Sequence, residues 1–313
     1  MPLMAEYALT PGIFDGNTFP EATRDELIYS SFALLREIFN NEGLVRNLYG
    51  GAWKDLFRDG NRNWHFKGKE LLRKLIEQNR LIIAPQVLAS FPTTEKEWCE
   101  EALASPQPME LGGIVTTDEI AAQYPRTHQQ IAAINRLPSA HWWSKRESTV
   151  RVTRTAASYI DHLRPLLMSA NLLSFIDPHI DPRKSHYRDF SRLIQEATHR
   201  CPLPLIQIHR AIGEGRTDWK AVFDAVLGPI VRATGVRIEL YIWDEMHDRY
   251  MISDIVGISM LNGFDTTRRT DSMGRTTWNR MSRAARDEVL RDYDDAAHLQ
   301  KFRGQNHFII QPI

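Results

Sequence analysis

The sequence VRIELYIWDEMHDRYMIS, residues 236–253, determines the expected architecture of the second half of the chain. Its first part, 236–243, is rich in β-branched and aromatic side chains, which predicts a buried strand. A polar segment follows, and a second apolar run extends over 249–253. A third run, 256–260, is close enough to pair with the second as a hairpin. Three strands of one sheet are therefore expected here, with the polar segment between the first two.

Upstream of this stretch, apolar runs of strand length alternate with segments of helical periodicity. The expected strands are 172–176 and 203–208, and the expected helices are 156–169, 187–200 and 219–234. This alternation predicts an α/β domain over residues 148–313, in which a mixed sheet is flanked by helices.

Residues 1–147 are expected to form a separate, mainly helical N-terminal domain. Thr23 with Glu26, and Thr94 with Glu97, have the spacing of capping boxes, which mark helix starts. Helices are predicted at 27–39, at 68–79, after Thr94 and at 127–137. This half contains no motif with an evident chemistry, so its role stays open.

One aromatic and basic cluster near the end of this half has two interpretations. Trp142, Trp143, Lys145 and Arg146 could dock a protein partner. Alternatively, the two tryptophans belong to the core, where large aromatic side chains are usually found.

The composition is that of an ordinary globular protein, with 42% apolar and 25% charged residues. Lysine plus arginine and aspartate plus glutamate each number 39, so the net charge does not by itself imply a nucleic-acid partner. Cys99 and Cys201 fit no disulfide or zinc pattern. The N-terminus does not resemble a secretory signal, and no apolar run approaches the roughly 20 residues that span a bilayer. We therefore expect a cytoplasmic protein without a membrane span.

Polar residues gather where three of the predicted strands end. Ligands of open α/β sheets bind outside the carboxyl ends of parallel strands. If these strands are parallel neighbours, their polar ends share one edge of the sheet. The residues at these ends are Asp177, His179, Asp181, His209, Arg210, Glu245, His247 and Asp248.

Three of the residues that follow the strand 236–243 have a distinctive spacing. His247, Arg249 and Asp254 stand at offsets 0, +2 and +7, and the first two would share one face of an extended segment. This pattern resembles the His-x-Lys-x4-Asp signature of the phospholipase D superfamily, with arginine in place of lysine. Gly257, Ser259 and Asn262 follow at non-standard spacing.

The segments IDPHI (176–180), YRDF (187–190), HDR (247–249) and NGFD (262–265) carry a second resemblance. In this order they are similar to the phospholipase-D-like C-terminal domain of microtubule-interacting-and-trafficking (MIT) proteins. The similarity covers about half of the chain, and in those proteins the domain serves as a lipid-phosphate binding surface.

The superfamily resemblance implies a phosphodiesterase that needs no metal or cofactor and works through a phosphohistidine. In this sequence it makes His247 the nucleophile, Arg249 the phosphate clamp and Asp254 the residue that orients them, with Glu245 beside them. The superfamily uses two histidine motifs for each active site, whereas this chain has one. The second histidine would come from a two-fold homodimer, or from His179 or His209 in the same chain. The substrate-binding residues would be Arg210, Asp248, Ser259, Asn262, Asp177 and Asp181.

Three functions remain open. The leading hypothesis is a nuclease, and it rests on the polar residues gathered at the strand ends. Six arginines (268, 269, 275, 280, 283 and 286) and Trp278 suit a nucleic-acid strand, or alternatively form a solvated irregular segment. A role in prokaryotic defence is what the superfamily resemblance implies. The second is a catalytically inactive module that binds a phosphorylated ligand, a nucleic acid or a partner protein. The third is a metal-dependent hydrolase, whose ligands would come from Asp177, His179, Asp181, Glu245 and His247.

Overall fold

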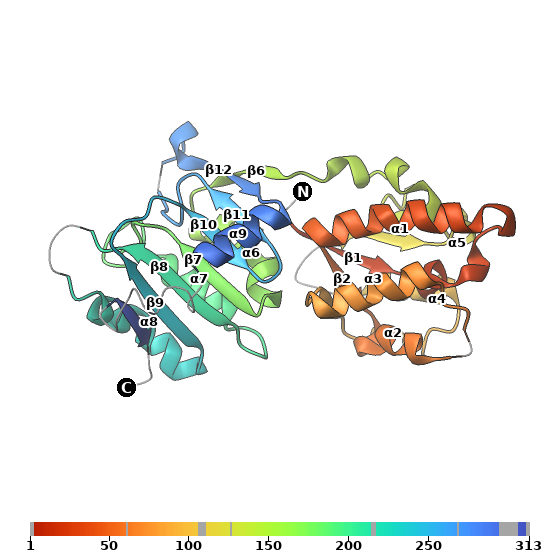
Figure 1. Cartoon of the computed structure of the whole chain (residues 1–313), viewed down its shortest axis with the longest axis horizontal. Coiled ribbons are helices and arrows are strands. Elements are labelled where there is room, and N and C mark those ends of the chain that lie inside the picture. Colours follow the sequence, from red (N-terminus) through yellow and green to blue (C-terminus); the bar gives the residue numbers. More distant parts are fainter. Residues whose placement is uncertain are drawn as a thin grey trace. The chain divides into compact units, whose positions relative to one another are not determined.

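The computed structural model describes residues 3–60, 62–105, 111–125, 127–213, 217–267, 269–293 and 306–310. The chain forms two compact units, Met1–Glu147 and Ser148–Ile313 (Figure 1). No helix among the described residues is both long enough and apolar enough to cross a membrane.

The N-terminal unit is built on a parallel sheet, which in the described residues has five strands in the order β3-β2-β1-β4-β5. The strands are β1 (Ala5–Leu9), β2 (Gly43–Asn47), β3 (Leu81–Ile83), β4 (Leu111–Thr116) and β5 (Ile131–Ala133). The helices are α1 (Arg24–Asn41), α2 (Ala52–Asp55), α3 (Phe66–Glu77), α4 (Glu95–Ala104) and α5 (Asp118–Gln123). This strand order is that of a doubly wound α/β fold.

The prediction of a mainly helical N-terminal domain was therefore wrong. Every residue of β1 and β2 is buried, so neither strand shows the alternation of apolar and polar residues that marks a half-exposed strand. Each also carries a charged residue, Glu6 or Arg46, and the two form a buried ion pair at 2.8 Å. The helix predicted at 127–137 was also wrong, because the chain forms β5 and then a 3-10 helix at Ile134–Ser139.

Of the two capping boxes predicted in this unit, one is confirmed. The capping box at the start of α4 is confirmed, because Thr94 accepts from the Glu97 N–H and the Glu97 carboxylate accepts from the Thr94 N–H. Thr23 makes no such bond with its side chain, although α1 starts directly after it. The tryptophan pair divides: Trp142 is buried against the Tyr7 ring at 5.3 Å, whereas Trp143 stacks on the Arg146 guanidinium.

The C-terminal unit is built on a mixed sheet, with eight strands among the described residues in the order β13-β9-β8-β7-β10-β11-β12-β6. The strands are β6 (Thr149–Thr153), β7 (Leu172–Ile176), β8 (Leu205–Ala211), β9 (Arg237–Trp243), β10 (Tyr250–Ser253), β11 (Gly257–Met260), β12 (Arg275–Arg280) and β13 (His307–Ile310). The helices are α6 (Ala156–Ser169), α7 (Phe190–Ala197), α8 (Trp219–Thr234) and α9 (Arg283–Asp292). The predicted α/β class is confirmed for this half.

The predicted strands of this unit are confirmed, and β10 and β11 form the expected antiparallel hairpin. β7, β8 and β9 are parallel neighbours, whereas β10 runs antiparallel beside β7. α7 packs on one face of the sheet, where the Phe190 and Phe175 rings lie 5.3 Å apart. α9 covers the opposite face (Figure 1). There its Val289 joins an apolar cluster with Ile176 and Ile252. At the edge where the parallel strands end, the loops that follow the strands supply the side chains.

Candidate functional site

The carboxyl ends of β7, β8 and β9 lie side by side, as the strand register requires. Ile176 pairs with His209, and His209 pairs with Tyr241. β10 runs the other way, so its first residue, Tyr250, pairs with Ile176 at the same edge. Segments that leave or enter four strands therefore meet at one place.

A pocket of about 660 Å³ lies at this edge, and we call it the carboxyl-edge pocket. Three segments line it: the loop after β7, the end of β8 with the start of α8, and the loop after β9. The polar and aromatic residues of its lining are His179, Asp181, Arg183, Lys184, Arg210, Thr217, Trp219, Asp244, Glu245 and His247. Five residues of the predicted site, His179, Asp181, Arg210, Glu245 and His247, thus share one pocket.

Arg210 is a preorganised cation at the base of this pocket. Its side chain is buried and donates to the main-chain oxygens of Ile180 at 2.6 Å and Ala211 at 2.7 Å. The guanidinium also lies over the Trp219 ring. Burial lowers the pKa of Arg210 to about 10, so the group stays charged at neutral pH. A fixed, partly desolvated guanidinium is well suited to bind a phosphate oxygen.

Asp181 is committed to a partner of its own in the pocket wall. Its carboxylate binds the guanidinium of Arg183 through two bonds of 2.9 Å, and these bonds are the main reason why the pKa of Asp181 is lowered. Lys184, next in the chain, makes no ion pair among the described residues and lines the same pocket. Lys184 is therefore a second cation of the pocket, besides Arg210, that no carboxylate of the described residues neutralises through an ion pair.

His179 faces this group of cations with an exposed imidazole. Partial burial of the ring is the largest influence and lowers the pKa of His179, whereas the nearby Asp177 carboxylate raises it. Arg249, Lys184 and Arg210 lower the pKa further, because each repels a second positive charge. The imidazole is therefore neutral at neutral pH, with a ring nitrogen that can act as a nucleophile or a base.

Asp177 lies beneath the pocket and organises its loops. Its carboxylate accepts from the His179 N–H at 2.9 Å, the Phe264 N–H at 3.0 Å and the Tyr187 hydroxyl at 3.1 Å. Burial is the largest influence on Asp177 and raises its pKa, although the three donors and Arg249 oppose the change. Asp177 thus supports the site from behind and does not reach substrate.

Gly263 allows the turn after β11 to approach this carboxylate. Its φ of +58° favours glycine, and a Cβ there would lie 1.9 Å from Oδ2 of Asp177. The same Cβ would lie 3.1 Å from Cδ of Arg249, so the side chain of Arg249 also lies against this turn. Arg249, the predicted phosphate clamp, therefore influences the pocket through its charge, and unlike Arg210 it does not line the pocket.

His247 and Glu245 form the outer wall of the pocket. Nε2 of His247 lies 3.2 Å from Oε1 of Glu245, and the two side chains are 84% and 82% exposed. Glu245 can accept the N–H of His247, which leaves Nδ1 for a ligand or for a second proton. Asp248, also exposed, contacts the Tyr250 hydroxyl at 3.4 Å and does not line the pocket.

His209 is not part of this pocket, contrary to the prediction. Successive residues of a strand point to opposite faces, so His209 lies on the face opposite Arg210. Its Nδ1 accepts from the Trp243 indole at 3.1 Å, and its ring stacks on Tyr241 at 4.7 Å. The side chain has no exposed surface, which excludes direct contact with a substrate.

The assignment of Asp254 to the site was also wrong. Asp254 follows the end of β10, and its carboxylate accepts from the N–H groups of Asn171 and Leu172 at 3.0 and 3.3 Å. Those groups are at the opposite edge of the sheet, about 13 Å along the strand from Tyr250 at 3.3 Å per residue. Asp254 therefore caps the start of β7, and the spacing of the phospholipase D signature does not gather its three residues here.

Two predicted substrate-binding residues lie away from the pocket lining. Ser259 pairs with Tyr250, and both side chains point to the face that carries His209. Asn262 lies in the turn next to Gly263, at the correct edge of the sheet but outside the pocket lining.

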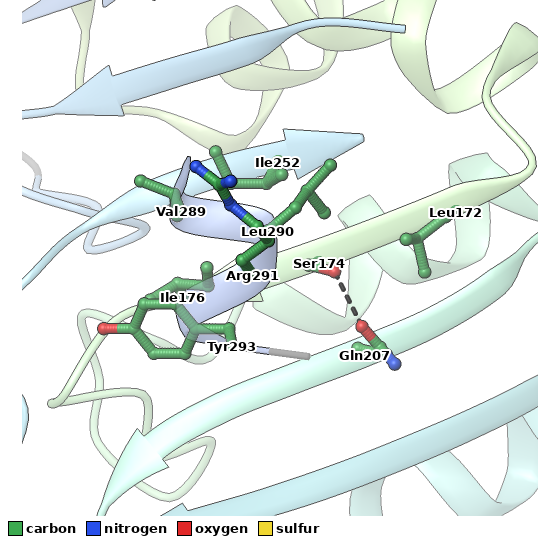
Figure 2. Close-up of a pocket in the computed structure, with 9 residues that line it drawn as sticks. All are labelled: Leu172, Ser174, Ile176, Gln207, Ile252, Val289, Leu290, Arg291 and Tyr293. Atoms are coloured by element: carbon green, nitrogen blue, oxygen red, sulfur yellow. Dashed lines mark hydrogen bonds between the residues drawn. The ribbon is translucent and has the colours of Figure 1, made fainter. Parts of the chain in front are cut away.

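A second cavity, of about 250 Å³, lies on the face that carries His209 (Figure 2). Its walls are mainly apolar, and Leu290 and Tyr293 enter it from α9 and the residue that follows. Its polar lining includes Arg291 and a bond from the Ser174 hydroxyl to Oε1 of Gln207 at 2.9 Å. This cavity holds none of the predicted catalytic residues.

The arginine-rich segment contains regular structure and a piece of the core. Trp278 is fully buried against the Tyr159 ring at 4.8 Å, so it cannot stack on a base. Arg286 is also buried and donates to the oxygens of Asp254 and Ile255. Arg268 lies outside the described residues.

Metal ligands do not gather at this edge. Over the ranges that the structure describes, no group of three or more histidine, cysteine, aspartate or glutamate side chains is placed to hold a metal ion. Asp177 and Asp181, two of the proposed ligands, are occupied by hydrogen bonds and by Arg183.

Comparisons with known proteins give no family. No protein-family model and no curated protein matches the chain. Among solved structures, the chain is similar to TrmBL2, described as an archaeal chromatin protein that shows a novel mode of DNA binding. The identity is 16%, the TM-score is 0.31, and the match spans about half of each protein, 48% of this chain and 50% of that one. A likeness of this size carries no argument, so function is inferred from the chemistry of the carboxyl-edge pocket.

Proposed function

We propose that the C-terminal unit is a metal-independent phosphodiesterase that works in the carboxyl-edge pocket. The observation that supports this proposal is that His179, His247 and the buried Arg210 line one pocket of about 660 Å³. Two imidazoles and a fixed guanidinium are the groups that a two-step transfer of a phosphoryl group requires. The substrate class is a phosphodiester, with a nuclease as the leading form.

In the first step, His179 attacks phosphorus. Its low pKa keeps the imidazole neutral, so a ring nitrogen has a free electron pair. The new P–N bond forms as the P–O bond to the leaving group breaks, and His247, in its protonated form, gives its proton to the departing oxygen. Arg210 and Lys184 hold the other phosphate oxygens and stabilise the charge that develops on them.

In the second step, His247 is neutral and accepts a proton from water. The water oxygen attacks phosphorus, the P–N bond breaks, and His179 is released with its electron pair. Glu245 holds His247 in position through both steps. This assignment exchanges the roles first predicted for the histidines, because His179 is the one among the cations. It also completes the pair within one chain, so a homodimer is not required for a second histidine.

A second candidate function is a module that binds phosphate esters without turnover. The observation that favours it is the high exposure of His247 and Glu245, since apart from their mutual bond the described residues cover little of either side chain. The resemblance to MIT proteins, in which the similar domain binds lipid phosphates, points the same way.

The test uses His179→Asn and His247→Asn, with His141→Asn, an exposed histidine of the other unit, as the matched control. Each protein is incubated with labelled single-stranded DNA and RNA and with bis(p-nitrophenyl) phosphate, in EDTA. We expect cleavage by the wild type and the control, and a loss of at least a hundredfold in both site variants. A phosphoryl group trapped on the His247→Asn protein would identify His179 as the nucleophile.

Other outcomes have a clear meaning. Cleavage that EDTA abolishes and manganese restores would support the metal-dependent hydrolase and overturn the proposal. Phosphate binding without turnover on any diester would overturn catalysis and establish the binding module. Full activity in both variants would remove the pocket from consideration.

A further inference from the structure

A second basin lies at the same edge of the C-terminal sheet as the carboxyl-edge pocket. Its volume is about 740 Å³. We call it the α6 basin, because the start of α6 forms one wall, and its principal residues are Thr155, His186, Arg188, Arg192, Thr266 and Thr267. It has no place in the chemistry proposed above.

Two arginines give this basin its charge. The side chains of Arg188 and Arg192 are exposed, and neither makes a hydrogen bond or an ion pair with the part of the chain that the structure describes. One carboxylate, that of Asp189, shares the lining. Guanidinium groups that line a concave surface without partners favour an anionic ligand, and their fork of donors fits phosphate oxygens.

The walls of the basin are held in place by bonds of their own. The Thr266 N–H and hydroxyl both donate to the His186 oxygen, at 2.6 and 3.0 Å, and the Thr267 N–H donates to the Arg154 oxygen at 2.8 Å. Ala156 and Ala157 begin α6 and also line the basin, where the first N–H groups of a helix lack acceptors within it. These amides add donors beside the two guanidiniums.

One loop connects the two sites. The residues that follow β7 line the carboxyl-edge pocket as far as Lys184, and from Ser185 onward they line the α6 basin. Lys184 and Arg210 thus line the first site, and Arg188 and Arg192 line the second. A mononucleotide or a single phosphate would occupy one site, whereas a polyanion could occupy both.

We infer that the α6 basin is a second phosphate subsite, and that the ligand is a single-stranded nucleic acid whose backbone passes through both sites. This inference rests on the proposed function and names its substrate class. A groove that follows the backbone with cations is typical of proteins that bind single strands. Arg188 and Arg192 would contact a phosphate away from the one that is cleaved.

The experiment measures the binding of fluorescein-labelled single-stranded oligonucleotides of 2 and 12 residues to the full chain by anisotropy. The variant is Arg188→Ala/Arg192→Ala. The matched control is Arg58→Ala/Arg73→Ala, two arginines of the other unit that are 79% and 70% exposed. Inorganic phosphate, followed through the NMR shift of the His179 ring, reports the carboxyl-edge pocket alone.

We expect the Arg188/Arg192 variant to bind the 12-mer at least tenfold more weakly, with a salt dependence whose slope falls by about 0.7 for one phosphate contact on a single strand. Its affinity for the dinucleotide and its phosphate-induced shift of His179 should equal those of the control. An unchanged affinity for the 12-mer would overturn the second subsite, and the phosphate shift would still test the first. In another outcome, the variant loses affinity for the 12-mer while phosphate causes no NMR shift of His179 in any protein. That result would overturn the proposed function and leave the α6 basin as the binding site.

A binding assay with lipid vesicles distinguishes lipid phosphates from nucleic-acid phosphates as the ligand of the basin. Binding to vesicles that contain anionic lipid, lost in the same variant and without affinity for the 12-mer, would overturn the assignment to nucleic acid. Absence of vesicle binding together with tight 12-mer binding supports it.

Discussion

The guanidinium carbon of Arg210 lies 3.1 Å from the centre of the Trp219 ring, in the wall of the carboxyl-edge pocket. The indole N–H of Trp219 donates to the Ile212 oxygen at 2.9 Å, which fixes the ring. The ring in turn fixes the guanidinium, together with the oxygens of Ile180 and Ala211. The charge of Arg210 is therefore positioned before any ligand enters.

Trp219→Leu should weaken phosphate binding about tenfold, because a partly desolvated cation–π contact contributes on the order of 1–2 kcal/mol. Trp219→Phe keeps a ring and should lose less. The measurement is calorimetric titration with inorganic phosphate, with circular dichroism to establish that each variant is folded. Equal affinity in the Leu variant and the wild type would contradict the positioning role.

Asp177→Asn should lower the free energy of unfolding by about 1–3 kcal/mol, measured by urea denaturation. Three donors converge on this carboxylate, and an amide offers one oxygen and turns an N–H toward a donor. The matched control is Asp248→Asn, an exposed carboxyl that should change stability by no more than about 0.5 kcal/mol. Equal stability of the two variants would show that Asp177 does not organise the loops.

The strands β7 to β11 of the C-terminal sheet could be predicted from the sequence because their signal is local, whereas β6, β12 and β13 were not predicted. Apolar, β-branched runs such as LLSFI at 172–176 are bounded by polar residues. In the N-terminal sheet, β1 and β2 carry no such signal, since Glu6 and Arg46 are charged residues inside fully buried strands. Their burial depends on a partner 40 positions away, which local patterns do not reveal.

The site was predicted in part for the same reason. Order and direction of the strands suffice to bring His179, Arg210 and His247 to one edge. They do not say which face a residue occupies, so His209 was included although it points the other way. Arg183, Lys184 and Trp219 were missed, because each belongs to the site through tertiary contacts rather than through a strand end.

The acid limb of the pH–rate profile should lie below pH 6.5. Protonation of His179 removes its nucleophilic electron pair, so kcat/KM falls as the pH drops through its pKa, which the surroundings lower from 6.5. A bound phosphate neutralises the nearby cations and should raise that pKa. NMR titration of the His179 ring, with and without phosphate, measures both values. A free-enzyme pKa above 6.5 would contradict the electrostatic argument.

Asp254→Asn should leave the rate of phosphodiester cleavage within about twofold of the wild type while lowering stability by on the order of 1 kcal/mol, the usual contribution of a hydrogen bond. Its carboxylate caps Asn171 and Leu172 at the opposite edge of the sheet. Kinetics and urea denaturation on the same samples separate the two effects. A loss of rate without loss of stability would restore Asp254 to the active site.

Glu6→Gln should destabilise the N-terminal unit by about 3–5 kcal/mol, because it removes the carboxylate that pairs with the buried charge of Arg46. Burial raises the pKa of Glu6 even beside this arginine, which marks the pair as costly to desolvate. The double variant Glu6→Leu/Arg46→Met removes both charges and should recover most of that loss. Urea denaturation of the wild type, both single variants and the double variant gives the coupling energy. Additive losses would mean that the pair contributes no interaction of its own, and that other contacts hold Arg46, among them its bonds of 2.7 and 3.0 Å to the oxygens of Ser105.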